Sequence, residues 1–227
     1  MNPNGDIRVK SSVFEKLENF WYHYKWRTIG VLFLAAVLTI CITQCCRREK
    51  SDVVVLYAGP YCYSGTEFDQ VKEELNRVLP ADYNGDGKKL TGLVTYQVMT
   101  EEQLTEYQNR VGLIDTSYFT GQASSYSNYI MTGECAILIL DESLYQKLAD
   151  AGRLRDLREV FPDLPSSAIG PYGIDFTKTA LYRDSDQLGS LPEGTVLCLL
   201  RPYVMGNTGK AGEYGNMTAM FVAMAKD

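Results

Sequence analysis

The sequence predicts an α/β protein in which a single N-terminal transmembrane helix is followed by one three-layer α/β domain with a mainly parallel or mixed sheet. Two observations lead to this class. An uncharged run of eighteen residues, 29–46, lies between basic residues near the N-terminus. Beyond it, short β-branched segments alternate with segments of helical periodicity, which is the pattern of α/β folds. The residues from 51 to 227 suffice for one domain with its own core.

Residues 29–46 (IGVLFLAAVLTICITQCC) predict the transmembrane helix. As a helix they would span roughly 27 Å, close to the thickness of the hydrocarbon core of a bilayer. The preceding segment 20–27 (FWYHYKWR) alternates rings with cations, which is typical of the headgroup level. No small-x-small cleavage site follows the run, so we expect a retained anchor rather than a signal peptide. The lipid bilayer is the expected partner of residues 29–46.

Counting basic residues on either side of the run favours a cytoplasmic N-terminus, with five Lys and Arg before it and three directly after it. We therefore expect a single-pass protein of the cell membrane whose C-terminal domain is extracellular. The predicted parts are a cytoplasmic juxtamembrane segment 1–28, the transmembrane helix 29–46, a linker 47–52 and an extracellular domain 53–227.

The net charge of the chain changes sign just after the apolar run. Residues 1–50 carry a net charge of +4 and residues 51–227 a net charge of −10. The basic end suits an anionic membrane surface. The acidic domain lacks the basic patch that nucleic acid requires, so nucleic-acid binding is excluded as a main function.

The domain begins with a predicted buried strand, 53–57 (VVVLY), which a Gly-Pro pair stops. Thr66 can cap the helix that follows, whose apolar residues recur at helical spacing as far as Pro80. A second strand is predicted over 90–99. The sequence 100–103 (TEEQ) then offers a capping box that opens a second helix.

The alternation continues through a polar stretch, 120–132, that is compatible with a helix. The most strand-like segment of the chain follows at 135–140 (CAILIL). A helix is predicted over 142–161, with Gly152 as an interruption.

After Pro165 the pattern loosens. Residues 172–182 and 195–201 predict strands, and Asn216 could cap a last helix over 217–225. Alternating strands and helices favour largely parallel strands with right-handed crossovers, while the loose last third leaves a mixed sheet open.

The stretch 133–141 (GECAILILD), followed by Tyr145, Leu148, Gly152, Leu154 and Leu157, resembles a stretch of bacterial extracellular solute-binding proteins of the type II periplasmic-binding lineage. Residues 172–175 (YGID) resemble their "YGI" strand, and the aromatic anchor 20–26 resembles that of uncharacterised membrane proteins of gut Firmicutes. The resemblance implies a periplasmic-binding-protein-like fold and non-catalytic ligand capture. Residues 51–227 match about one lobe of such proteins, and Ala136 replaces their usual acidic residue.

Histidine chemistry is excluded for the domain because the only histidine, His23, lies in the anchor segment. Cys62, Cys135 and Cys198 lack the close spacing of zinc ligands, and they form either one disulfide and a thiol or three thiols. No cofactor is expected apart from calcium, considered below. The pair Asp141-Glu142, at the end of a strand, leaves a carboxylate-dependent cell-surface hydrolase as the alternative function, although an Asp there also serves as a helix cap.

Candidate ligand-binding residues gather where the first and third predicted strands end. The loop after the first strand places hydroxyls and amides at a helix N-terminus, and its tyrosines could stack on a ligand ring. Helix capping and ring packing are the alternative roles for these residues. The candidates are Tyr57, Tyr61, Tyr63, Ser64, Thr66 and Asp141.

Asp82, Asn84 and Asp86 match the first ligands of a calcium loop, with Gly87 at its sixth position. Leu93 stands where an EF-hand needs a bidentate Glu. A tight polar turn is the alternative interpretation.

Together these observations predict a membrane-anchored, non-catalytic, solute-binding-like domain. Its expected partner is a small solute or surface polymer, or, if the domain acts as a scaffold, another membrane protein.

Overall fold

The computed structural model describes residues 12–46 and 50–226. Several basic residues on which the predicted topology rests, among them Arg8 and Arg47, lie outside the described residues, as do residues 47–49 of the predicted linker. The chain divides into two units, 1–49 and 50–227. Each unit is described by itself.

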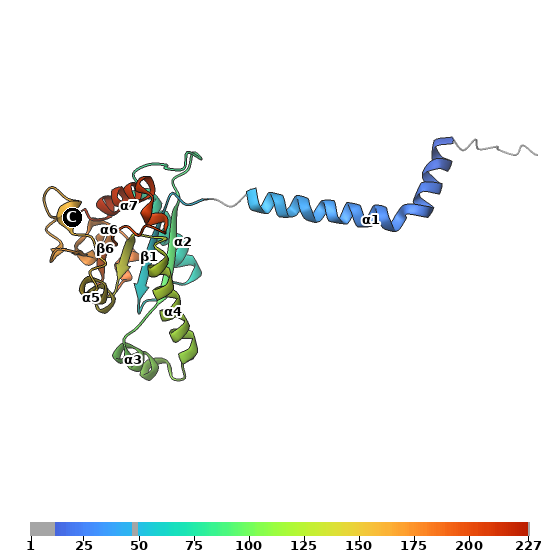
Figure 1. Cartoon of the computed structure of the whole chain (residues 1–227). Helices are drawn as coiled ribbons and strands as arrows, with labels where there is room; N and C mark the ends of the chain where they lie inside the picture. The colour runs from blue at the N-terminus through green and yellow to red at the C-terminus, as the bar shows by residue number, and fades with distance from the viewer. Residues whose placement is uncertain (1–11, 47–49, 227) are drawn as a thin grey trace, which may run out of the picture. The chain divides into compact units, whose positions relative to one another are not determined.

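The first unit contains the helix α1 (Ser12–Cys46), shown in Figure 1. Its segment Phe20–Thr43 is long and apolar enough to cross a membrane, and none of its most apolar stretch is buried against protein. The hydroxyls of Thr39 and Thr43 donate to carbonyl oxygens of the preceding turn, each at 2.8 Å, so neither needs water. The predicted apolar helix is thus present, and it begins well before residue 29.

The described part of the second unit forms one open six-stranded sheet in the order β2-β1-β3-β6-β5-β4. β1 is parallel to both β2 and β3, whereas β6, β5 and β4 are antiparallel to their neighbours. The sheet is therefore mixed, with a parallel half and an antiparallel half. The strands are β1 (Val53–Gly59), β2 (Thr91–Gln97), β3 (Ile137–Leu140), β4 (Ala168–Ile169), β5 (Gly173–Asp175) and β6 (Val196–Leu199).

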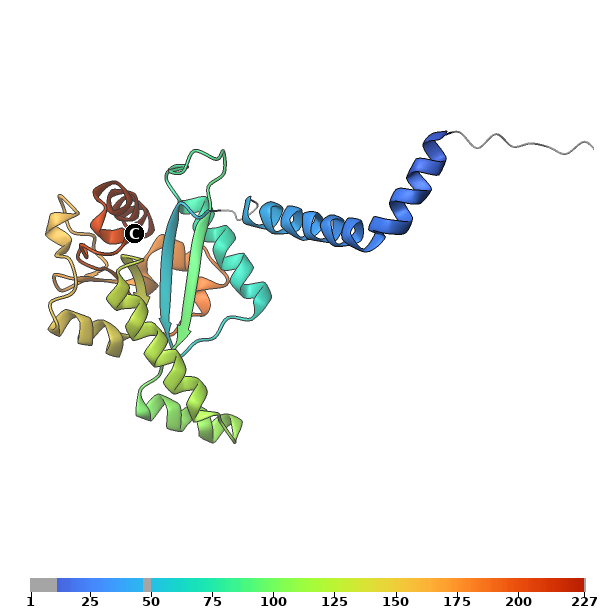
Figure 2. The same cartoon turned by 45° about the vertical axis from the view of Figure 1, so that its right-hand side comes forward.

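Helices cover both faces of this sheet. The crossovers from β1 to β2 and from β2 to β3 run in opposite directions along the sheet, so right-handed connections place α2 and α4 on opposite faces (Figure 2). α7 packs beside α2, and α5 lies on the face of α4. The helices are α2 (Gly65–Val78), α3 (Glu101–Val111), α4 (Thr116–Thr132), α5 (Glu142–Asp150), α6 (Ala180–Arg183) and α7 (Ala211–Met224).

The core centres on β3 and β6, in which every residue is buried. Strands covered on both faces read as continuous apolar runs, which explains why 135–140 is the most strand-like segment of the sequence. All described strands and all described buried core residues lie between residues 53 and 225. The second unit therefore has a complete core of its own and can fold without α1.

The predicted helix 142–161 is wrong beyond Asp150. Gly152 adopts φ +64°, a left-handed conformation that ends the helix. The chain then turns back so that Leu154 forms a bridge with Leu200, beyond the end of β6. Only a short 3-10 helix, Leu157–Glu159, follows.

The predicted strand 172–182 is also too long, because β5 ends at Asp175 and a 3-10 helix and α6 follow. The side chain of Asp175 accepts the backbone N–H of Thr177, which starts that helical turn. Asn216 does not cap the last helix, since α7 begins at Ala211. The cap of α2 is Ser64 rather than Thr66.

Candidate functional site

The candidate ligand-binding residues lie at the carboxyl ends of β1 and β3. β1 lies between β2 and β3, so the connections that leave β1 and β2 diverge at this edge. Such a topological switch point is where open α/β sheets bind their ligands. Five of the six candidates occupy the loops and helix starts at this edge. Tyr61, Tyr63, Ser64 and Thr66 follow β1, and Asp141 follows β3. The sixth candidate, Tyr57, approaches the edge from within β1.

Three of the tyrosines form one cluster. The ring centroids of Tyr57 and Tyr63 are 5.7 Å apart, and those of Tyr61 and Tyr63 are 5.0 Å apart, both edge to face. The hydroxyl of Tyr57 accepts the backbone N–H of Tyr61 at 3.1 Å. Burial raises the pKa of Tyr57 and of Tyr63 above the ordinary value, so both stay protonated. Tyr57 and Tyr63 therefore support the loop, while Tyr61 is the ring that lines a pocket.

Ser64 and Glu67 form a capping box at the start of α2. The Ser64 N–H donates to Glu67 Oε2 at 2.7 Å, and the Glu67 N–H donates to Ser64 Oγ. Glu67 also accepts the Tyr61 hydroxyl at 3.2 Å. The backbone N–H groups of Ser64 and Glu67 thus already have partners, and Thr66 is exposed in the first turn. The Glu67 carboxylate places a negative charge in this first turn, which disfavours an anionic ligand here.

Asp141 caps α5 and connects it to α3. Its Oδ1 accepts the Ser143 N–H at 3.0 Å, and its Oδ2 accepts the side-chain amide of Gln103 at 3.0 Å. Glu142, the second member of the predicted carboxylate pair, is exposed in the first turn of α5. Both oxygens of Asp141 are therefore committed to structural hydrogen bonds.

A pocket of about 320 Å³ opens beside this edge. Tyr61 forms part of its wall, and α3 contributes polar side chains and the ring of Tyr107, above which the Arg110 guanidinium lies at 5.4 Å. The pocket combines rings and apolar groups with a few polar groups, as small-molecule sites do. We call it the carboxyl-edge pocket. Its lining residues are Pro60, Tyr61, Met99, Gln103, Glu106, Tyr107, Arg110 and Pro192.

Sequence reasoning missed the contribution of α3. Gln103 was recognised only as part of the Thr100 capping box, which the structure confirms. Tyr107 lies one turn beyond Gln103, so helical spacing could have placed both side chains on one face. Pro192 could not have been found, because only the antiparallel pairing of β6 with β3 brings it to this edge.

The candidate calcium ligands belong to a polar loop between α2 and β2. Asp82 accepts the N–H groups of Gly85 and Gly87 at 2.7 and 2.8 Å, and Asn84 accepts that of Asp86 at 2.9 Å. The Asn84 bond is an Asx turn, and the two Asp82 bonds close the loop around it, as expected for a tight polar turn. Within the described part of the chain, no group of three or more His, Cys, Asp or Glu side chains is arranged to hold a metal ion.

The three cysteines of the domain are thiols in the structure, and the two that lie in predicted strands are buried. Cys62 is exposed, whereas Cys135 and Cys198 are buried. The thiol of Cys135 donates to the carbonyl oxygen of Val54 at 2.9 Å. Burial raises the pKa of Cys135 to about 12, so this thiol is unreactive at neutral pH.

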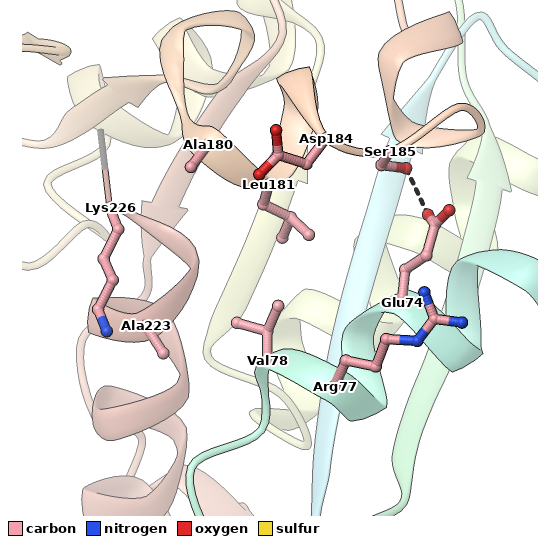
Figure 3. Close-up of a pocket in the computed structure, with 9 residues that line it drawn as sticks. All are labelled: Glu74, Arg77, Val78, Ala180, Leu181, Asp184, Ser185, Ala223 and Lys226. Atoms are coloured by element: carbon pink, nitrogen blue, oxygen red, sulfur yellow. Dashed lines mark hydrogen bonds between the residues drawn. The ribbon is translucent and has the colours of Figure 1, made fainter.

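A second pocket, of about 400 Å³, lies between α2, α6 and α7 (Figure 3). Arg77 and Lys226 stand on its opposite walls, with apolar side chains between them. The Ser185 hydroxyl donates to Glu74 and ties α2 to the loop after α6. Arg77 and Lys226 are exposed, so water screens their attraction for a ligand. The carboxyl-edge pocket, at the switch point, is the stronger candidate site.

Comparison with known proteins finds no matching family model, no matching curated protein and no matching solved structure.

Proposed function

We propose that this chain is a single-pass membrane protein that captures a small, uncharged, ring-bearing solute such as a carbohydrate in the carboxyl-edge pocket. The observation that carries the proposal is the position of this pocket at the switch point of the sheet, with the rings of Tyr61 and Tyr107 in its wall. The resemblance of 133–141 to solute-binding proteins supports the same function.

The hydrogen bonding of the edge favours an uncharged ligand. The N-termini of α2, α3 and α5 are each capped by a side chain of this chain, and each has a carboxylate in its first turn, which disfavours a phosphate or carboxylate there. The net charge of −10 over residues 51–227 also repels anions. Flat tyrosine rings suit the apolar face of a sugar ring.

The test is a titration of the full chain in detergent micelles with mono- and oligosaccharides, followed by calorimetry. Replacing Tyr107 by Ala removes one ring, and we expect affinity to fall about three- to tenfold, because a ring contact contributes about 0.5–1.5 kcal/mol. Tyr203, which is 39% exposed on a different loop, gives the matched control Tyr203→Ala, which should bind normally. No saturable heat with any saccharide, or equal losses in the two variants, would refute capture at this pocket.

The proposed topology, with the domain outside the cytoplasm, rests on the basic residues before the apolar run and has its own test. Cys62 is the exposed cysteine of the domain, while Cys135 and Cys198 are buried. A membrane-impermeant maleimide added to intact cells should label a variant in which Cys41, Cys45 and Cys46 are replaced by Ser, and it should fail to label the same variant with Cys62→Ser added. Labelling of Cys62 only after the membrane is opened would place the domain in the cytoplasm.

A further inference from the structure

A third pocket lies at the opposite edge of the sheet from the carboxyl-edge pocket. β6 is antiparallel to β3, so the end of β6, just beyond which Arg201 follows, lies at the amino end of β3. The pocket has a volume of about 820 Å³, which is within the range of small-molecule sites, about 300–1,000 Å³. We call it the arginine pocket. Its walls include Arg155, Glu159, Arg201, Thr208, Tyr214 and Gly215.

Strand pairing brings the two arginines of this pocket together. Leu154 forms an antiparallel bridge with Leu200. Arg155 and Arg201 each follow one member of this bridge, so they are diagonal neighbours on the other face of the paired segments. Long side chains reach each other across such a diagonal, and both arginines line the pocket. Neighbouring like charges repel, and an anion bound between them offsets that repulsion.

The guanidinium of Arg155 is held in place and largely removed from water. Its side chain is 24% exposed, its Nε donates to Glu159 Oε2 at 3.2 Å, and its central carbon lies 5.3 Å from the ring centroid of Tyr214. The Tyr214 hydroxyl in turn donates to the carbonyl oxygen of Leu200 at 2.7 Å, which fixes the ring. Such a cation attracts an anion more strongly, and loses less rotamer freedom on binding, than a mobile surface arginine.

Arg201 and Thr208 add further donors. Arg201 Nε donates to the carbonyl oxygen of Leu154 at 3.0 Å. The bonds that Arg155 and Arg201 make to Glu159 and to Leu154 both use Nε, so these bonds do not occupy the terminal Nη nitrogens. Thr208 is buried, and its hydroxyl oxygen accepts the backbone N–H of Tyr203 at 2.9 Å, so the hydroxyl retains a proton to donate.

The net charge of the lining is positive, which distinguishes this pocket from the two described above. Glu159 offsets one of the two arginines, and its side chain is 58% exposed. In the carboxyl-edge pocket Arg110 and Glu106 cancel. In the pocket between α2, α6 and α7, two basic and two acidic side chains cancel. Among these three pockets, the arginine pocket is therefore the one whose lining attracts an anion.

The charges around the arginine pocket do not reverse this sign. Three basic and three acidic side chains on the adjoining segments balance one another: Arg153, Arg158 and Lys210, and Glu134, Asp156 and Glu213. Lys210 and Glu213 also pair directly, at 3.0 Å. The net charge of −10 over residues 51–227 opposes anions at long range, but physiological salt screens charges beyond about 8 Å. The two guanidinium groups therefore decide what binds.

From these observations we propose that the arginine pocket binds a phosphate monoester of a small organic molecule. Such an ester carries about 1.5 to 2 negative charges at neutral pH, more than a carboxylate, and its oxygens match the paired donors of two guanidinium groups. The inference goes beyond saccharide capture and does not depend on it, because the two pockets lie at opposite edges of the sheet.

The first test is a calorimetric titration of the full chain, in non-ionic detergent micelles, with inorganic phosphate and with glycerol 3-phosphate. We expect saturable binding that glycerol does not reproduce. Arg201→Ala should weaken it at least about tenfold, because it removes charge-assisted hydrogen bonds. The matched control is Arg158→Ala, which removes an exposed arginine that does not line the pocket. No saturable binding of either probe, or equal losses in the two variants, would overturn the proposal.

The second test adds a charge instead of removing one. Gly215 is exposed in the pocket wall, and a Cβ there meets no atom within 4 Å, so a side chain fits without disturbing the fold. Gly215→Glu places a carboxylate beside the arginines and should weaken phosphate binding at least about tenfold. Gly121→Glu is the matched control, since Gly121 is an exposed glycine of α4 with the same free space. If Gly215→Glu bound phosphate as tightly as Gly121→Glu, the site would be refuted.

A third comparison identifies the source of the phosphate, because a lipid headgroup offers the same chemistry. Phosphatidate, whose headgroup is a phosphate monoester, is added to the micelles in place of the soluble probes. We expect glycerol 3-phosphate to bind without it and to bind more tightly than acetate. Binding of phosphatidate alone, or equal binding of acetate, would overturn the assignment to a soluble phosphate ester. Failure of saccharide binding, by contrast, leaves these measurements unaffected.

Discussion

Asp52 lies directly before β1, and we expect its replacement to lower the stability of the domain more than replacement of an ordinary surface residue. Its carboxylate accepts three backbone N–H groups of the loop between α2 and β2. Oδ1 accepts those of Tyr83 and Asn84 at 2.7 and 2.8 Å, and Oδ2 accepts that of Leu90 at 2.9 Å. One side chain thus holds the loop at both of its ends.

The cost of removing this carboxylate follows from these three bonds. A hydrogen bond to a charged group contributes about 1.5–3 kcal/mol, but exposed amides recover part of that from water. Asn84 is exposed, whereas Tyr83 and Leu90 are partly buried. Asp52→Ala should therefore lower the free energy of unfolding by about 2–4 kcal/mol, or about 5–10 °C in Tm for a domain of this size. Asp52→Asn keeps one acceptor oxygen and should lose about half as much.

The assay is urea unfolding of residues 50–227, followed by circular dichroism, because this unit contains the whole described core. Asp69→Ala is the matched control: Asp69 is exposed on α2, and its loss should change stability by less than about 0.5 kcal/mol. If Asp52→Ala were as stable as Asp69→Ala, the inference that this carboxylate holds the loop would be wrong.

Three further predictions concern the same unit. At pH 8 a thiol reagent should modify Cys62 in the folded domain and reach Cys135 only after unfolding, because burial raises the pKa of Cys135 to about 12; two fast-reacting thiols would contradict this. Hydrogen bonds from backbone N–H groups, chiefly that of Gly87, hold the pKa of Asp82 below its ordinary value of 3.8, so its contribution to stability is present above that pH and lost as the pH falls through the lower folded value. The stability difference between the native domain and Asp82→Asn should accordingly shrink in acid, and a pH-independent difference would contradict the assignment. Gly206→Ala should lower the yield of folded protein sharply, since a Cβ there would collide with the carbonyl oxygens of Thr132 and Gly133; a normal Tm would show that the two segments can separate.

Local signals were enough to predict the parallel half of the sheet. The strands at 53–57, 90–99 and 135–140 and the capping box at 100–103 depend on periodicity and on side chains within three residues of each other. The structure confirms each of them, with strand ends shifted by a few residues.

The antiparallel half depends on contacts that are distant in sequence. β5 has only three residues, and it forms where Ile174 pairs with Leu197 in β6. The early end of α5 likewise reflects the pairing of Leu154 with Leu200 as well as the conformation of Gly152. No pattern within either segment indicates which distant residues it will pair with.

For the candidate site, sequence reasoning selected side chains at the carboxyl ends of β1 and β3 but not the side chains of α3 and Pro192 that line the pocket beside them. Tyr61 and Asp141 are local to strand ends, so they could be selected. Whether Ser64 caps a helix or is free to bind a ligand depends on the orientation of Glu67, which only the structure provides.

The position of β1 has a mechanical consequence for a force applied to the domain from its N-terminal side. Such a force enters the sheet through Asp52 at the amino end of β1, which is bonded on one side to β2 over seven registered pairs and on the other to β3 over four. A force directed along β1 loads both ladders lengthwise, so the hydrogen bonds share the load and must shear together rather than break one at a time. The strand that receives the force is thus held by neighbours on both sides, unlike a strand at the edge of the sheet.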